Sequence, residues 1–340
     1  MLGMRAVVLD ESGLHAVELP RPEVALGEAL VRVHACGVNR LDLLIRDGRT
    51  AKPRFPHVLG SEAAGVVEAS ESNLPAAKVG MRVAIAPYLS DHQCEFCLRG
   101  EEAICLRGDI LGLARDGGYA EYVAVPASAL VPLPDEVSYD AAAAVGLATI
   151  TAWHMLVLRA QLRPGETVLV IGASGGVGSA AVQVAKLAGA RVIATAGSAD
   201  KLRQARELGA DATINYREQD YVQKVRALTG KRGVDVVVEH VGEETWEKSV
   251  ACLARMGRLV TCGSMTGDTG HLNLWSLFAK EISIIGSYGG SRADLTAVLQ
   301  LVAQGRLRPV IHANYSLERV PEAHNTMEAR EHFGKLIVNP

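Results

Sequence analysis

The sequence lacks three features that mark whole classes of protein. It has no uninterrupted apolar stretch long enough to span a membrane, and its first apolar run is too short for a signal peptide. It has no block of like charges, and a formal net charge of −3 offers no basic surface for nucleic acid. We therefore expect a cytoplasmic protein whose partners are small molecules, with neither a nucleic acid nor a membrane among them.

Cysteine is also scarce. Only six cysteines occur in 340 residues, and three of them are crowded at Cys94, Cys97 and Cys105. In a chain without a secretion signal, such crowding indicates a metal site before disulfides. The length, with 49% hydrophobic and 21% charged residues, is enough for a large core and about two domains.

The first 130 residues contain short apolar runs separated by turn signals, which predicts a mostly β module. After it, the alanine-rich run from Ser138 to Leu158 predicts one helix capped by Ser138. From residue 164 onward, strands and helices alternate, which predicts a parallel sheet covered by helices on both faces. The final stretch predicts helices near 293–304 and 321–330 and a strand at 335–339, which we expect to fold back onto the first module.

A glycine turn lies between a buried-type strand and an amphipathic helix in this alternating region. It reads Gly-Ala-Ser-Gly-Gly-Val-Gly over residues 172–178. Glycines let the backbone approach a pyrophosphate, which then faces the free N–H groups at the start of the helix. An ordinary tight turn is the alternative, but the flanking strand and helix favour a dinucleotide site. Its predicted contacts are Gly172, Gly175, Gly176, Val177 and Gly178.

The strand after this helix ends without the acidic residue that usually binds the ribose 2′-hydroxyl of NAD. Ser198 and Lys201 can offer a donor and a positive charge to a 2′-phosphate there. Tyr216 and Arg217 follow the next strand, where the adenosine end should lie, although Arg217 is equally typical of a solvated surface charge. We therefore predict NADPH as the cofactor, with NADH less favoured.

The crowded cysteines have metal-ligand spacing. Asp91, Cys94, Cys97 and Cys105 follow the pattern D-x2-C-x2-C-x7-C. Three thiolates and a carboxylate can complete a tetrahedral zinc site, and such a closed site stabilises a loop without doing chemistry. We predict one structural zinc per chain, with His92 as a rival to Asp91 and three free cysteines as the alternative.

Further motifs occur in a characteristic order along the chain. They are residues 36–42 (CGVNRLD), 60–65 (GSEAAG), 149–153 (TITAW) and 333–335 (FGK), together with the cysteines and the glycine turn. This set resembles the medium-chain dehydrogenase/reductase superfamily, the zinc alcohol dehydrogenase and quinone oxidoreductase group, over essentially the whole length.

The resemblance implies an α/β architecture in which a Rossmann domain is inserted into another domain. The Rossmann domain, with its doubly wound parallel sheet, would span residues 148–290. A GroES-like, mostly β catalytic domain would comprise residues 1–147 and 291–340. It also implies a homodimer, joined through the strand near Ile282–Ile285, whose edge would otherwise be exposed.

The resemblance also locates the catalytic zinc of the alcohol dehydrogenases. Its ligands would be a cysteine where this chain has Asn39, a histidine where it has Ser61, and a cysteine or acid near Leu147. None is retained, and a catalytic zinc needs about three protein ligands. Leu41 likewise replaces the proton-relay hydroxyl. A zinc held by Cys36, His57 and Glu62 is a less favoured alternative.

Without a Lewis acid, the cofactor must carry the chemistry. By resemblance, Asn39 and Asp42 would line the nicotinamide end of the site, with Arg40 near the pyrophosphate and Thr151 beside the ring. Gly263 and Ser264 would pass the nicotinamide ribose, Lys335 would close the site, and Ser61 would stand in the place of the histidine. Each of these could instead be structural; the predicted catalytic set is Asn39, Asp42, Ser61, Thr151 and Lys335.

The predicted function is therefore NADPH-dependent hydride transfer to a quinone or an activated enone without a catalytic metal. Two alternatives stay open. One is a zinc-dependent alcohol dehydrogenase with atypical ligands, and the other is a non-catalytic NADPH-binding sensor.

Overall fold

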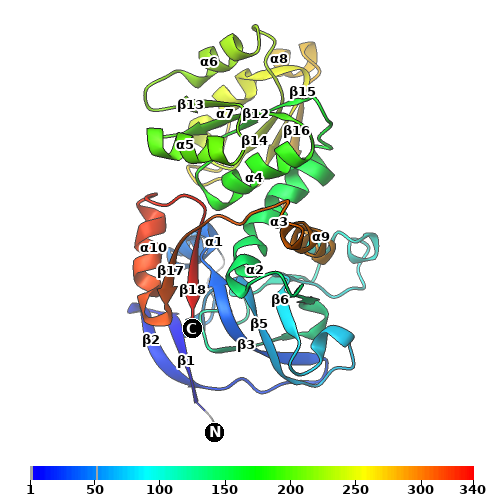
Figure 1. Cartoon of the computed structure of the whole chain (residues 1–340), viewed down its shortest axis with the longest axis vertical. Helices are drawn as coiled ribbons and strands as arrows, with labels where there is room; N and C mark the ends of the chain where they lie inside the picture. Colours follow the sequence, from blue (N-terminus) through cyan, green and yellow to red (C-terminus); the bar gives the residue numbers. More distant parts are fainter. Residues whose placement is uncertain (1–2, 51–52) are drawn as a thin grey trace. The chain divides into compact units, whose positions relative to one another are not determined.

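A computed structural model describes residues 3–50 and 53–340 (Figure 1). The chain divides into two compact units, Met1–Ile150 with Gly290–Pro340, and Thr151–Gly289. The sequence-based division puts the second unit at 148–290. Within the described residues no single helix is long and apolar enough to cross a membrane, and the bent pair Tyr139–Val145 and Ala148–Arg159 meets that test only when taken together.

The first unit is built on a seven-stranded sheet of order β10-β6-β5-β3-β18-β17, with β9 paired to β3 as well. Its strands are β3 (Glu28–Gly37), β5 (Glu62–Ser70), β6 (Arg82–Ile85), β9 (Tyr122–Pro126), β10 (Leu130–Pro132), β17 (Ile311–Ser316) and β18 (Lys335–Asn339). A second sheet has the order β2-β1-β4, with β1 at Gly3–Asp10, β2 at Gly13–Pro20 and β4 at His57–Val58. All strand pairs are antiparallel except β17 with β18.

The C-terminal strand β18 pairs with β3, so the last segment of the chain completes a sheet begun near the N-terminus. The apolar faces of these strands share one core, which includes Val31 and Val33 of β3 and Leu336 and Val338 of β18. Burial of such side chains contributes roughly 1.5–3 kcal/mol each, which holds the segments of the unit together. The register also brings the first residues of β5 and β18 to the end of β3.

The helices that accompany these sheets include α1 (Arg40–Arg46), α2 (Tyr139–Val145), α9 (Arg292–Ala303) and α10 (Val320–Glu328). Ser138 caps α2 as predicted, since its Oγ accepts from the N–H of Ala141 at 3.1 Å. The prediction of one helix over 138–158 is wrong. After α2 the chain breaks at Gly146 and Leu147, then forms α3 (Ala148–Trp153) and a π-helix at His154–Arg159.

The second unit is a six-stranded parallel sheet of order β13-β12-β11-β14-β15-β16. Its strands are β11 (Thr167–Val170), β12 (Arg191–Ala196), β13 (Ala212–Asn215), β14 (Val234–Glu239), β15 (Leu253–Thr261) and β16 (Ser283–Gly286). Its helices are α4 (Gly176–Leu187), α5 (Ala199–Glu207), α6 (Tyr221–Leu228), α7 (Glu243–Ala251) and α8 (Leu274–Ala279). Right-handed crossovers place α4 and α5 on one face and α6 and α7 on the other.

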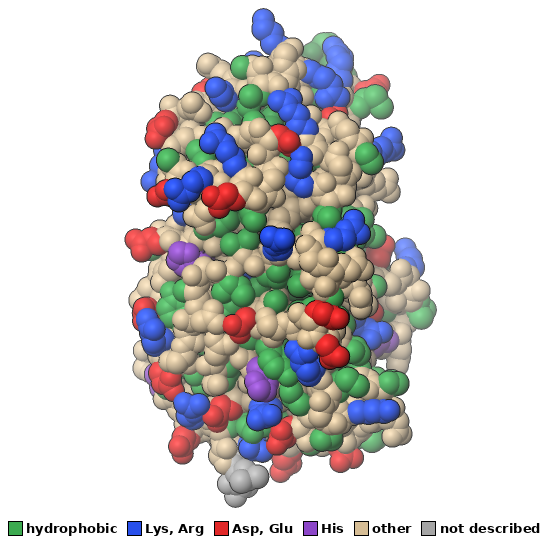
Figure 2. All heavy atoms as spheres, in the orientation of Figure 1, with side chains coloured by type: hydrophobic (Ala, Val, Ile, Leu, Met, Phe, Trp, Pro, Cys, Tyr) green, Lys and Arg blue, Asp and Glu red, His purple; other side chains and the backbone are tan. Residues whose placement is uncertain are grey.

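The strand order reverses between β11 and β14, and ligands of such sheets bind beyond the carboxyl ends of the strands at that point. Each of these strands is buried, as a parallel sheet covered on both faces requires. Figure 2 shows both acidic and basic side chains over the face in view.

Candidate functional site

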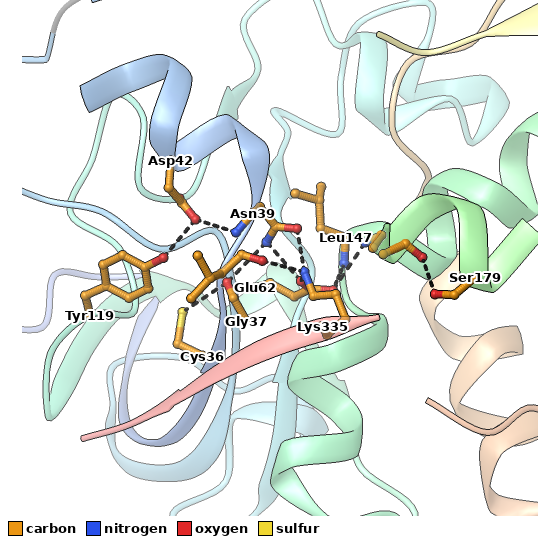
Figure 3. Close-up of polar contacts among 12 residues, drawn as sticks. Cys36, Gly37, Asn39, Asp42, Glu62, Tyr119, Leu147, Ser179 and Lys335 are labelled. Atoms are coloured by element: carbon orange, nitrogen blue, oxygen red, sulfur yellow. Dashed lines mark hydrogen bonds and ion pairs between the residues drawn. The ribbon is translucent and has the colours of Figure 1, made fainter. Parts of the chain in front are cut away.

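Three buried side chains of the first unit converge at the end of β3. The ammonium of Lys335 lies 2.6 Å from Oε2 of Glu62, and it donates to Oδ1 of Asn39 at 2.6 Å and to the carbonyl of Val38 at 2.8 Å. Figure 3 shows these groups pointing toward one another. We call Asn39, Glu62 and Lys335 the lysine cluster. All three N–H groups of the ammonium are engaged within it.

The other polar atoms of the lysine cluster are also satisfied. Nδ2 of Asn39 donates to Oε2 of Glu62 at 2.9 Å and to the carbonyl of Gly37 at 3.2 Å. Oε1 of Glu62 accepts from the backbone N–H of Leu147 at 2.5 Å. Glu62 is fully buried, and such a carboxylate is tolerated only when paired and hydrogen-bonded in this way.

Neighbouring strands bring the lysine cluster together. Glu62 opens β5 opposite Gly37, Lys335 opens β18, and both strands pair with β3. Asn39 follows β3 and caps α1, where the carboxylate of Asp42 accepts from the Asn39 backbone N–H at 2.7 Å. Asn39 and Leu147 stand where the resemblance places zinc ligands of the alcohol dehydrogenases. In this chain both instead bond to the salt bridge between Lys335 and Glu62.

Asp42, in the first turn of α1, is fully buried and bonds to a second set of side chains. Its Oδ2 also accepts from the hydroxyl of Tyr119 at 2.9 Å. The hydroxyl oxygen of Tyr119 in turn lies 3.4 Å from Nε2 of His324. Burial raises the pKa of Asp42 to about 6, although the bonds from Asn39 and Tyr119 lower it. Burial also lowers the pKa of His324 to about 3, so its ring is neutral.

Asp42 therefore holds Asn39 rather than facing outward. Ser61 is fully buried, and within the described residues its Oγ has no hydrogen-bond partner. Arg40 is partly exposed at the start of α1, and burial together with the charge of Arg330 lowers its pKa. Thr151 is a buried residue of α3, in the second unit. Sequence reasoning found Asn39, Asp42 and Lys335 separately, but it missed Tyr119 and His324 entirely.

The four residues predicted to bind a structural zinc lie close together. Sγ of Cys94 lies 3.5 Å from Sγ of Cys97 and 3.8 Å from Sγ of Cys105, and one ligand atom from each of these and Asp91 lies within 4.8 Å of the others. We call these four residues the cysteine lobe. They fit a tetrahedral zinc site of three sulfurs and one oxygen. His92 lies outside the group and faces Glu102 at 4.0 Å.

In the part of the chain that the structure describes, the cysteine lobe is the one group of this kind. The alternative set of Cys36, His57 and Glu62 does not come together as a metal site. Nε2 of His57 lies 3.1 Å from the carbonyl of Gly112, and its Nδ1 lies 3.3 Å from Asp116. The fold thus uses each of these three side chains for a separate contact.

The glycine turn of the second unit follows β11 and leads into α4, whose N-cap is Gly175. Gly172 has a φ of +64°, and its N–H donates to Oγ1 of Thr195 at 3.1 Å. A Cβ on Gly178 would collide with the carbonyl of Gly172, so this glycine allows the helix to pack on the turn. Gly176 and Val177 are partly exposed at the first turn of α4, where N–H groups are free for an anion.

The end of β12 is surrounded by polar side chains. A Cβ on Gly197 would lie 2.7 Å from the Tyr216 hydroxyl and 3.0 Å from Nε of Arg217, so both side chains cover that glycine. Oγ of Ser198 caps α5 by accepting from the N–H of Lys201 at 3.4 Å. These donors stand where the ribose of a dinucleotide's adenosine is recognised in this sheet type.

Comparison with known proteins relates both units to one superfamily. Residues 25–135 match the family described as "Alcohol dehydrogenase GroES-like domain", and residues 176–304 match "Zinc-binding dehydrogenase". Human quinone oxidoreductase is 34% identical over 98% of this chain and 97% of its own length. The acryloyl-coenzyme A reductase of Sulfurisphaera tokodaii is 29% identical over 99% of this chain and its whole length.

The solved structures agree. A crystal structure of an NAD-dependent alcohol dehydrogenase has a TM-score of 0.95 and 42% identity, and the match covers 99% of this chain and all of that one. The names of these relatives thus give different substrates, and all of them describe oxidoreductases.

Proposed function

Since the chain belongs to the medium-chain dehydrogenase/reductase superfamily and is an oxidoreductase, we propose that it transfers hydride from NADPH to a quinone or an activated enone without a catalytic metal. The lysine cluster carries this proposal. A catalytic zinc would need about three protein ligands, and Asn39, Ser61 and Leu147 offer an engaged amide, a hydroxyl and an aliphatic side chain.

The lysine cluster also limits the acid chemistry of the site. The Lys335 ammonium has no N–H left to donate to a substrate oxygen, since it already bonds Glu62, Asn39 and Val38. Lys335 is therefore unable to polarise a substrate carbonyl by donating a hydrogen bond to its oxygen. A quinone or an activated enone is already electrophilic, so positioning against the cofactor is the main requirement.

The dinucleotide would be held by the second unit. Gly175, Gly176 and Val177 would face the pyrophosphate, and Gly263 and Ser264 would pass the nicotinamide ribose beyond β15. The bound dihydronicotinamide supplies the hydride. Tyr216, Arg217, Ser198 and Lys201 favour NADPH, because they surround an end of β12 that carries no acid.

The cysteine lobe would hold one structural zinc. Arg107 lies 2.7 Å from Oδ2 of Asp91, while Oδ1 accepts from the N–H groups of Gln93 and Cys94 at 2.8 and 3.0 Å. The backbone bonds from Gln93 and Cys94 lower the pKa of Asp91, and together with Arg107 they would orient the carboxylate as a ligand. We also propose a homodimer through the outer edge of β16, because among residues 3–50 and 53–340 the strand pairs with β15 alone.

Stopped-flow NADPH oxidation across a panel of quinones, enones and aldehydes tests this function. We expect turnover with quinones or enones, about one zinc per chain, and a lower dissociation constant for NADPH than for NADH. Turnover confined to aldehydes and alcohols with two zinc ions per chain would favour a zinc-dependent alcohol dehydrogenase. Tight binding without turnover on any substrate would favour a sensor.

Asn39→Ala tests the lysine cluster within this function. The change removes the amide that fixes Lys335 and Glu62, so we expect turnover at saturating NADPH to fall at least tenfold, which corresponds to about 1.4 kcal/mol. His312→Phe, at an exposed position of β17, serves as the control and should keep wild-type turnover. Unchanged turnover in Asn39→Ala would remove Asn39 from the catalytic machinery.

A further inference from the structure

A rigid loop follows β14 in the second unit. The carboxylate of Glu239 is fully buried and organises it, since Oε1 accepts from the N–H groups of Val241 at 2.7 Å and Gly242 at 3.2 Å. Oε2 accepts from the hydroxyl of Ser249 at 2.5 Å. These bonds tie the backbone that follows His240 to the end of β14, so the place of His240 in the loop is set by the fold.

The ring of His240 lies beside the glycine turn. A Cβ on Gly172 would lie 3.4 Å from Cε1 of His240, 3.6 Å from its Nε2 and 3.7 Å from Cγ2 of Val241. No backbone atom stands closer to that position. The space that the missing side chain of Gly172 leaves open is thus bordered by His240 and Val241, at the point where the strand order reverses.

Nε2 of His240 is buried and has no hydrogen-bond partner in residues 3–50 and 53–340. A buried polar atom left unsatisfied costs about 1–3 kcal/mol, so it calls for a ligand. Burial lowers the pKa of His240 and outweighs the opposing effect of the Glu239 charge, which leaves the ring neutral.

A neutral imidazole has one N–H donor and one acceptor nitrogen, and the tautomer decides which of the two Nε2 is. The hydroxyl of a ribose can donate to Nε2 or accept from it. A phosphate diester oxygen has no proton to give and can only accept. A ribose hydroxyl therefore satisfies Nε2 in either tautomer, which a diester oxygen does not.

The position of His240 selects one hydroxyl-bearing group of a dinucleotide. The strands β11, β12 and β13 form one mononucleotide half of the sheet, and β14, β15 and β16 form the other. His240 belongs to the second half. Its backbone carbonyl oxygen would lie 3.0 Å from a Cβ placed on Gly263, which follows β15. The second nucleotide, which carries the nicotinamide, lies over this half.

We propose that Nε2 of His240 forms a hydrogen bond with a hydroxyl of the nicotinamide ribose and thereby positions the second nucleotide beside Gly172. The inference rests on the proposed function, since it requires a bound dinucleotide. It adds a contact that the glycine turn does not provide. His240 acts on the sugar common to NADPH and NADH, so it contributes affinity without selecting between them.

Calorimetric titration with three ligands tests the inference. NADPH and 2′-phospho-ADP-ribose both carry the second ribose, whereas adenosine 2′,5′-bisphosphate lacks it. We expect His240→Phe to weaken the first two by about tenfold, and to leave the third within about twofold of the wild type. His240→Gln retains an acceptor and should recover most of the loss. His312→Phe should bind all three ligands like the wild type.

Two results would overturn the assignment. The first is His240→Phe binding all three ligands as the wild type does. The second is an equal loss of affinity for all three, which would mark a disturbed loop rather than a ribose contact. A wild-type chain that binds none of the three ligands would instead overturn the proposed function, and this inference with it. The bisphosphate arm keeps these failures distinct.

Discussion

The lysine cluster and the cysteine lobe are two groups of ligand-type side chains in one unit, and they differ in how their negative charge is balanced. In the lysine cluster, Glu62 is neutralised by the ammonium of Lys335, and every N–H of that ammonium is engaged. In the cysteine lobe, three sulfurs and a carboxylate face one another without a cation from the chain between them. The first arrangement supplies its own cation, whereas the second has the ligand types and spacing that could hold a metal ion.

The difference shows that a superfamily position does not define a metal site by itself. What matters is whether the local charge is already balanced. Ionised thiols at 3.5 and 3.8 Å repel one another unless a cation is bound, and burial of Glu62 would be very costly without Lys335. Three substitutions can break or sharpen this comparison.

Lys335→Met should have the largest effect on stability. It leaves the buried carboxylate of Glu62 without its cation, and breaking such a pair costs about 3–5 kcal/mol. Urea-induced unfolding, followed by circular dichroism, measures the loss. The double variant Glu62→Gln with Lys335→Met removes both charges and should recover part of it. A loss below about 1 kcal/mol in the single variant would mean that the cluster is not held by charge.

Cys105→Ser should have the next largest effect. The four ligands enclose residues 91–105, and cross-linking a loop of about 15 residues stabilises a fold by at most about 3 kcal/mol. We expect bound zinc to fall below about half an equivalent and the unfolding free energy to fall by about 2 kcal/mol. Cys262→Ser, outside the lobe, should keep its zinc. Zinc that stays at one equivalent in Cys105→Ser would contradict the ligand assignment.

Asp42→Asn should have the smallest effect at low pH, and its effect should grow as the pH rises. Burial raises the folded-state pKa of Asp42 to about 6, above the ordinary value of 3.8, so the folded chain binds this proton more tightly than the unfolded chain. The resulting stability is full below about pH 4 and is lost as pH rises through about 6. The loss is on the order of 3 kcal/mol.

Unfolding at a series of pH values compares the two chains. Asn has no proton to lose, so the decline between pH 4 and 7 should be shallower in Asp42→Asn than in the wild type. The amide oxygen can still accept from Tyr119 and from the Asn39 backbone, which keeps the comparison clean. Identical pH profiles would mean that Asp42 is ionised in the folded chain as easily as in water.

Local patterns in the sequence predicted the sites that are built from nearby residues. The spacing of Asp91 and the three cysteines was sufficient, because all four ligands lie within 15 residues of one loop. The strand and helix around the glycine turn were likewise visible, since buried parallel strands have continuous apolar runs. The superfamily resemblance supplied the remainder of the architecture.

The lysine cluster could not be predicted as a unit. Asn39 and Lys335 are 296 positions apart, and they meet because of the register of β3, β5 and β18. A shift of one residue would point each side chain to the opposite face. The predicted helix over 138–158 failed for a related reason. Leu147 gives its N–H to Glu62, a partner from a distant strand that overrides the helical preference of the alanines.

The glycine turn has one more consequence, for the thermodynamics of nucleotide binding. Thr195 holds the N–H of Gly172, and Gly178 packs against the carbonyl of the same residue, so the turn is already in its final geometry. A preorganised site spends little conformational entropy when its ligand arrives. Binding should therefore resemble docking onto a rigid surface, with affinity set by contacts and by the release of water rather than by ordering of the chain.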